Sequence, residues 1–103
     1  MIKHIVLWRL KEFAEDASKE ENALKVKALL EEMRGKIPGM LKLEVGLDFE
    51  KSEAASDIVL YTEFESRKAL NAYQIHPLHM KVKEFLPLVR TERRVVDYEI
   101  EYS

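Results

Sequence analysis

The spacing of hydrophobic and polar residues predicts four strands along the chain. Residues 2–11 are rich in β-branched and aromatic side chains and are apolar at both odd and even positions, which is typical of a central strand covered on both faces. Residues 58–65 have the same character. Residues 40–49 alternate strictly between apolar and polar side chains, which predicts a strand near a sheet edge with one solvent-exposed face. Residues 90–102 are predicted to form the last strand, with these apolar side chains on one side: Val96, Tyr98, Ile100 and Tyr102.

A first helix is predicted between the first two strands. Ser18 and Glu21 have the spacing of a capping box, which marks a helix start. Apolar residues then recur every three or four positions and form one stripe: Val26, Leu29, Leu30, Met33 and Ile37. Gly35 and the pair Pro38-Gly39 are expected to end this helix.

A second helical region lies between the third and fourth strands, and a proline interrupts it. Ser66 is a good N-cap for its first part. His76 precedes Pro77, and a residue before proline avoids the α conformation, so the helix is expected to break there. Pro77 can begin a short further helix to about Phe85, and Pro87 is expected to end it.

The resulting order, strand-helix-strand-strand-helix-strand, predicts a single α+β domain over residues 1–103. Two helical regions can cover only one face of a four-stranded sheet. The first and third strands nevertheless carry apolar residues on both faces, so a lone copy would expose a patch that includes Ile5, Leu7, Val59 and Tyr61, or the residues opposite them. Because two-fold dimers commonly cover such patches, we predict a homodimer that pairs through the sheet face.

Composition narrows the possible partners and compartments. The net charge is −2, with 17 basic and 19 acidic residues, so nucleic acid is not an expected partner. The pair Arg93-Arg94 is interpreted as a solvated strand end. The chain has no cysteine, and Lys3, Arg9 and Lys11 interrupt the apolar N-terminal run, so we expect a cytoplasmic protein with no membrane partner.

The candidate chemistry lies in the segment from Tyr73 to His79. Histidine exchanges protons near neutral pH, and His79 would lie in the first turn of the helix that Pro77 begins. The helix dipole disfavours a protonated imidazolium at that position and so favours the neutral imidazole, which is the form that a general base must have. The bend at Pro77 could bring the Tyr73 hydroxyl toward His79, and His4 shares a strand face with apolar residues.

Each of these residues also has a structural interpretation. His4 could be a hydrogen-bonded core residue, His76 a cap or turn residue, and Tyr73 a core residue at helical spacing. His76 and His79 are three residues apart, but no third ligand lies in their segment, so no metal site is expected. The chain also lacks a glycine-rich phosphate loop, and no cofactor is expected.

Four short segments resemble the stress-responsive A/B barrel domain (Dabb) family over essentially the whole chain. They are Lys3-His4-Ile5-Val6-Leu7, Ile37-Pro38-Gly39, Tyr73-x-x-His76-Pro77-x-His79 and Asp97-Tyr98. The resemblance implies a ferredoxin-like fold with an antiparallel four-stranded sheet, and dimers whose sheets pack into a shared α/β barrel.

The segment from Tyr73 to His79 is also similar to that of plant olivetolic acid cyclase, a family member that closes a linear polyketide by aldol condensation. The resemblance implies that His79 is the general base, that Tyr73 positions the substrate and the base, and that His4 lines the same pocket. His76 matches a histidine with a structural role.

Three functions stay open at this point. The first is a cyclase, isomerase or lyase that removes a proton next to a carbonyl of a small apolar substrate. The second is a non-catalytic stress-response dimer, with or without a small ligand. The third, suggested by other dimeric A/B barrels, is a haem-degrading or cofactor-free monooxygenase. In the haem-degrading case, His76 or His79 would bind the haem iron and Trp8 would crowd it.

Overall fold

The fold is built on one four-stranded sheet whose neighbouring strands are all antiparallel. A computed structural model, which describes residues 1–101, places the strands in the order β4-β5-β1-β6. Their bounds are β1 (Ile2–Leu10), β4 (Met40–Leu47), β5 (Ile58–Phe64) and β6 (Arg90–Glu99). The two strands predicted to be central, β1 and β5, are central, and β4 is an edge strand as expected. Tyr102, predicted to belong to the last strand, lies outside the described residues.

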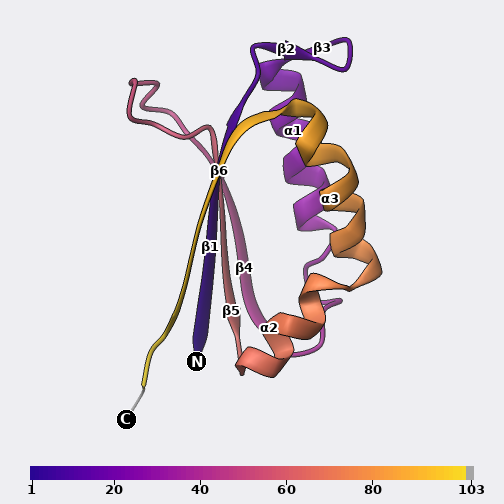
Figure 1. Ribbon diagram of the computed structural model, residues 1–103, viewed down its shortest axis with the longest axis vertical. Coiled ribbons are helices and arrows are strands. Elements are labelled where there is room, and N and C mark those ends of the chain that lie inside the picture. Colours follow the sequence, from indigo (N-terminus) through magenta and orange to yellow (C-terminus); the bar gives the residue numbers. More distant parts are fainter. Residues whose placement is uncertain (102–103) are drawn as a thin grey trace.

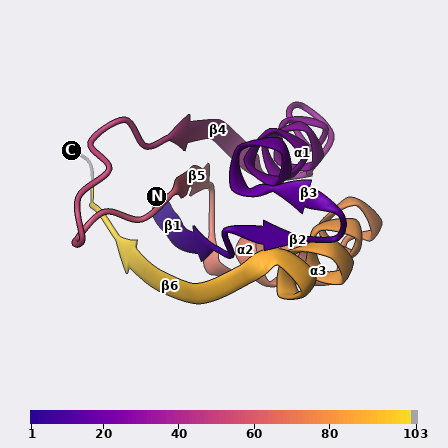
Figure 2. The same ribbon diagram turned by 90° about the horizontal axis from the view of Figure 1, so that it is seen from above.

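The helices all cover the same face of this sheet. They are α1 (Lys19–Glu31), α2 (Arg67–Gln74) and α3 (Pro77–Val89), and Figure 1 shows them on one side of the strands. Seen from above in Figure 2, α1 and α3 lie beside each other over the sheet. A small hairpin of β2 (Phe13–Ala14) and β3 (Ala17–Ser18) precedes α1 and was not predicted. Its turn residues, Glu15 and Asp16, are not a glycine-based turn signal.

The first helix begins as its sequence predicts and ends earlier. The Ser18 hydroxyl accepts from the Glu21 backbone N–H at 3.2 Å, and the Glu21 carboxylate accepts from the Ser18 N–H at 3.1 Å. Helix α1 stops at Glu31. Met33 and Ile37 lie in the turns that follow, and their side chains are still buried. The apolar stripe therefore predicted burial correctly and helix length incorrectly.

The proline bend between α2 and α3 has the predicted shape. Ser66 caps α2 through the Ala69 N–H at 3.1 Å, and His76 caps α3 through the Leu78 N–H, which donates to His76 Nδ1 at 3.1 Å. The prediction that Pro87 ends the last helix is wrong, because α3 continues to Val89 with Pro87 inside it. A proline in the final turn removes only one helical hydrogen bond, and burial of Val89 holds that turn in place.

Strict alternation along β1 separates a covered face from an open one. The side chains under the helices are buried: Ile2, His4, Val6, Trp8 and Leu10. The opposite face, which we call the open face, points away from all three helices. It carries these side chains from β1, β5 and β6: Lys3, Ile5, Leu7, Val59, Tyr61, Glu63, Arg94, Val96 and Tyr98. Within residues 1–101 no helix is long and apolar enough to cross a membrane.

The alternation predicted for residues 40–49 holds only in part. Leu43 is buried, but a register shift between Met40 and Lys42 leaves Leu41 as an extra, exposed residue. The strand ends at Leu47, so Phe49 lies in the following loop with 95% of its surface exposed. A β-bulge changes which face a residue points to, and an alternating pattern alone does not reveal one.

Gly39 fixes how α2 meets the start of β4, and its replacement by alanine is expected to destabilise the protein. Its φ is +79°, and a Cβ there would lie 2.5 Å from the Ala69 Cβ on α2. Left-handed strain and overpacking together predict a loss of about 2–4 kcal/mol in the free energy of unfolding.

Gly35→Ala is the matched control, because Gly35 has φ +74° but nothing within 4 Å of its added Cβ. It should cost only about 1 kcal/mol, the strain alone. Urea unfolding of both variants measures the difference, and equal losses would mean that the contact with Ala69 relaxes freely.

Candidate functional site

A pocket of about 280 Å³ lies between the covered face of the sheet and the helices. Its walls are largely apolar and come from β1, β5, α1 and α3: Val6, Trp8, Leu30, Leu60, Val82, Leu86 and Pro87. Its polar lining comes from these side chains: His4, Tyr73, Gln74, His79, Lys83, Arg90 and Arg93. An apolar cavity with a few convergent polar groups is the usual form of a small-molecule site. The structure therefore brings His4, Tyr73 and His79 to one pocket.

Tyr73 and His79 meet because the His76-Pro77 bend folds α3 back against the end of α2. Their ring centroids are 4.2 Å apart with planes inclined at 35°. The Tyr73 ring also packs against His4, at a centroid distance of 5.9 Å and an angle of 69°. Tyr73 is thus the centre of an aromatic cluster that holds both histidines next to the cavity.

His79 is held as a neutral ring with one nitrogen available to the pocket. Its Nδ1 donates to the Gln74 carbonyl at 3.2 Å, which leaves Nε2 as the nitrogen that carries the lone pair. Burial lowers the pKa of His79 to about 4; the bond to Gln74 opposes this, and the charges of Lys83, His4 and Arg93 reinforce it. At neutral pH the His79 ring is therefore an unprotonated acceptor.

The Tyr73 hydroxyl is fully buried and has no hydrogen-bond partner among residues 1–101. It is therefore not bonded to His79, although the two rings are in contact. Burial raises the pKa of Tyr73 well above its usual range, so the hydroxyl keeps its proton and can donate it in a hydrogen bond. A buried polar group without a partner costs about 1–3 kcal/mol, and an oxygen of a bound ligand would remove that cost.

His4 is oriented by a residue that was not predicted to contribute. Its Nδ1 bonds Asp97 Oδ1 on the neighbouring strand β6, and the two residues are register partners. A carboxylate bonded to one ring nitrogen fixes the tautomer and the orientation of a histidine. Here the bond to Asp97 occupies Nδ1 and leaves Nε2 of His4 for the pocket. The alternation of residues 90–99 could have placed Asp97 on this face of the sheet. That Asp97 lies opposite His4 could be known only from the register between β1 and β6.

The remaining histidine of the motif has a structural position. His76 caps α3 and does not line the pocket, so the interpretation of His76 as a cap residue is confirmed. In the part of the chain that the structure describes, no group of three or more potential ligands is arranged to hold a metal ion.

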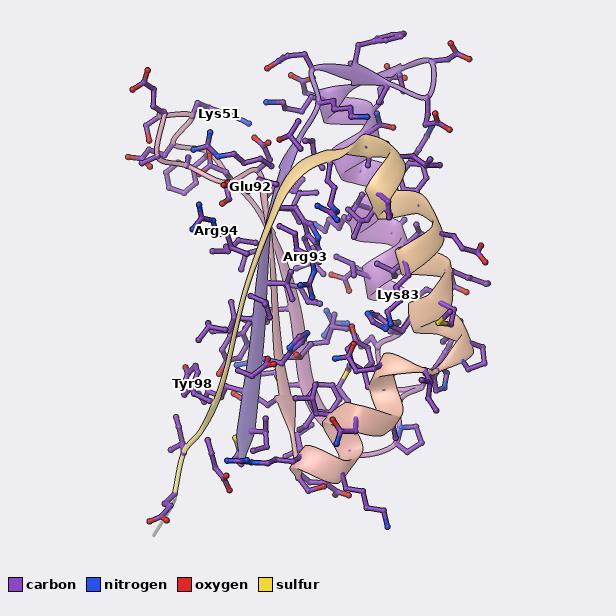
Figure 3. The ribbon with its side chains drawn as sticks, viewed as in Figure 1. Lys51, Lys83, Glu92, Arg93, Arg94 and Tyr98 are labelled. Carbon is purple, nitrogen blue, oxygen red and sulfur yellow. The ribbon has the colours of Figure 1, made fainter. Side chains whose placement is uncertain are left out.

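Two basic side chains that the sequence did not indicate as site residues reach the same pocket. Figure 3 shows Arg93 pointing from β6 toward the helices and Lys83 pointing from α3 toward the sheet. Arg94 points to the opposite, open face, where it pairs with Glu92 at 3.0 Å. Arg93 and Arg94 are both exposed, as the interpretation of a solvated strand end expects, but they face opposite sides of the sheet because adjacent residues of a strand alternate.

Acidification is expected to destabilise the wild type through His79. The pKa of His79 is about 4 in the folded protein and near 6.5 in the unfolded chain, so the unfolded chain binds more protons between these values. Stability is therefore complete above pH 6.5 and is lost as the pH falls toward 4. Discounted for partial solvent exposure, the loss is about 1 kcal/mol.

Thermal unfolding at pH 7 and pH 4.5, at one fixed protein concentration, measures this effect. His79→Gln should lose about 4–8 °C less in Tm than the wild type does on acidification. Equal losses in the two proteins would show that His79 titrates near its ordinary value.

An antiparallel sheet covered on one face by helices, with a small pocket between the two layers, defines a ferredoxin-like α+β protein. More specifically, the chain belongs to the stress responsive A/B barrel domain (Dabb) family, whose model matches residues 2–100. None of the curated proteins matches the chain.

Several solved structures are similar to this chain. A dimeric protein of unknown function from Bacteroides fragilis is 33% identical, with a TM-score of 0.81 over 96% of this chain and 95% of its own. A Dabb protein from Mesorhizobium loti is 23% identical, with a TM-score of 0.71 over 98% and 97%. A protein from Nitrosomonas europaea with a suggested antibiotic biosynthesis monooxygenase activity is 21% identical, with a TM-score of 0.77 over 99% and 100%. The last two likenesses show the fold alone.

Proposed function

We propose that this protein is an enzyme that removes a proton from a carbon next to a carbonyl, and so acts as a cyclase, isomerase or lyase without a cofactor. His79 is the general base, Tyr73 is the hydrogen-bond donor to the carbonyl oxygen, and His4 is a polar wall that orients the substrate. The observation that carries the proposal is the buried hydroxyl of Tyr73, which has no partner in residues 1–101 and belongs to a side chain that lines the same pocket as the neutral His79 ring.

The reaction begins with a balanced proton transfer. The lone pair of His79 Nε2 takes the α-proton, the electrons of the C–H bond form a C=C bond, and the carbonyl π electrons move to its oxygen. Tyr73 donates to that oxygen as it becomes an enolate, which is where a preorganised donor is most effective. The enolate carbon then either regains a proton, attacks a second carbonyl or expels a leaving group.

These three fates correspond to an isomerase, a cyclase and a lyase. The cyclase outcome is the one that the similarity of residues 73–79 to plant olivetolic acid cyclase favours. The pocket volume of about 280 Å³ is at the lower end for ligand sites, which favours a small substrate.

The test measures α-hydrogen exchange, because exchange requires proton removal and no knowledge of the natural substrate. The probes are 2-hexanone and 5-oxohexanoate in D₂O at neutral pH, followed by the loss of their ¹H NMR signals next to the ketone. We expect the protein to accelerate exchange beyond an equal concentration of free imidazole. Exchange no faster than with imidazole for both probes would favour the non-catalytic alternative, a stress-response or ligand-binding dimer.

We also propose that residues 1–103 act as one domain and that two copies pair through the open face of the sheet. The related proteins of known structure include dimers. On this chain, Ile5 lies between Tyr61 and Val96 on the open face, and Leu7 lies beside Val59. The loop between β4 and β5 carries the exposed Phe49 and projects on the open-face side in Figure 1, where a second copy would contact it.

A further inference from the structure

We propose that the substrate of this pocket is an anion, a small keto acid whose carboxylate is bound by Arg93 and Lys83 at the pocket mouth while its ketone lies between Tyr73 and His79. This deepens the proposed function, on which the choice of a ketone rests. The carboxylate site itself rests on the basic lining of the pocket.

The lining of the pocket is basic, although the chain as a whole is slightly acidic. The lining includes three permanently basic side chains, Lys83, Arg90 and Arg93, and no carboxylate from residues 1–101. The chain as a whole has a net charge of −2. Acidic residues are thus abundant elsewhere and are kept out of this lining, which is the arrangement that attracts an anion.

The two proposed ligands of the carboxylate come from opposite walls. Arg93 is the register partner of Trp8, whose side chain is buried on the covered face, so both point toward the pocket. Lys83 is one helical turn after His79 on α3 and donates to the Gln74 carbonyl at 3.0 Å, the same carbonyl that binds His79. No carboxylate of the described chain pairs with Arg93, whereas Arg9 and Arg94 both pair with Glu92. Arg93 therefore has its full hydrogen-bonding fork available.

The depth of the polar groups gives the orientation of the ligand. Lys83 and Arg93 are exposed, whereas His4 and Tyr73 are buried deeper in the same pocket. An anionic head would remain at the solvent side, and an apolar chain with its ketone would extend inward along the apolar walls. The planar guanidinium of Arg93 matches a carboxylate in particular, since it can bind both oxygens at once.

A bound carboxylate would also act on the base. The positive charges of Lys83 and Arg93 both lower the pKa of His79, and a carboxylate beside them would offset part of that effect. Substrate binding would then make His79 a stronger base at the moment when it has to take a proton. This coupling gives the anion a role in the chemistry as well as in binding.

The test is a binding measurement with no reaction, and Trp8 supplies the signal. Trp8 is the chain's one tryptophan and lines the pocket, so its fluorescence reports occupancy. The probes are hexanoate and hexanamide at pH 7.5, which have similar shapes and differ in charge. We expect hexanoate to bind the wild type about a hundredfold more tightly, because the two charge-assisted contacts each contribute about tenfold.

The variants locate that preference. Arg93→Gln and Lys83→Gln should each lower hexanoate affinity by about tenfold and leave hexanamide affinity nearly unchanged. Arg94→Gln is the matched control, with the same change in charge one residue away on the open face, and it should alter neither affinity. Equal binding of the two probes by the wild type, no binding of either, or an equal effect of Arg94→Gln would overturn the proposal.

This result is separable from the proposed reaction. A charge preference that depends on Arg93, together with no α-hydrogen exchange, would contradict the catalytic proposal and support an anion-binding pocket. Exchange of 2-hexanone as fast as that of 5-oxohexanoate, with no preference for hexanoate, would support catalysis and contradict the keto acid.

Discussion

Replacing His79 by glutamine is expected to lower the rate of α-hydrogen exchange by about 10²–10⁴-fold, the usual contribution of a general base. Glutamine has a similar size and can still donate to the Gln74 carbonyl, but it has no nitrogen that can accept a proton at neutral pH. The measurement is the loss of the ¹H signals of 5-oxohexanoate in D₂O, with hexanoate binding as the check that the pocket is intact.

His76→Asn is the matched control for this variant. It also removes a histidine from the segment between Tyr73 and His79, but asparagine is a good N-cap and can keep the bond to the Leu78 N–H. We expect its exchange rate to equal that of the wild type. If His79→Gln retained the wild-type rate, or if the two variants lost activity equally, His79 would not be the base.

Tyr73→Phe separates the donor from the base. It keeps the aromatic packing on His4 and His79 and removes only the buried hydroxyl. The loss in exchange rate should be smaller than for His79→Gln, and stability should stay the same or rise because an unpaired buried group is removed. A large loss of stability would show instead that the hydroxyl bonds a group within the folded protein.

The sequence pattern predicts the fold well because its strongest signals are local. The capping box at Ser18, the N-cap at Ser66 and the bend at Pro77 all act within a few residues, and all three are present in the structure. The errors fall where a tertiary contact decides the outcome. Burial of Val89 extends α3 past Pro87, and a register shift against β5 leaves Leu41 exposed.

The same division applies to the site. His4, Tyr73 and His79 could be chosen from a short motif and a strand position, and the structure places all three at one pocket. Asp97 and Arg93 could not be chosen this way, because their importance depends on which β1 residue each one faces across the sheet. Pairing His4 with Asp97 and Trp8 with Arg93 requires the strand register, which the spacing along a single chain does not contain.

The open face of the sheet supports the proposal that two copies pair there. Apolar side chains from three neighbouring strands meet there, around Ile5, Val59 and Val96. The same face also carries a hydrogen-bonded cluster of polar side chains. The Tyr61 hydroxyl accepts from Lys3 Nζ and donates to the Glu63 carboxylate, both at 2.6 Å. A partner sheet that covers this face would bury the apolar residues and leave the internal polar bonds satisfied.

Val96→Glu is therefore expected to convert the proposed dimer to a monomer, as measured by the molar mass in size-exclusion chromatography with light scattering. Val96 is 52% exposed on the open face in a single copy, so the folded monomer can tolerate a carboxylate there, whereas a dimer interface would bury two of them without partners. Val95→Glu is the matched control, because Val95 is 48% exposed but is the register partner of Val6 on the helix side. It should remain a dimer at the same concentration. If Val96→Glu stayed dimeric, or if Val95→Glu dissociated equally, the two copies would not be pairing through the open face of the sheet.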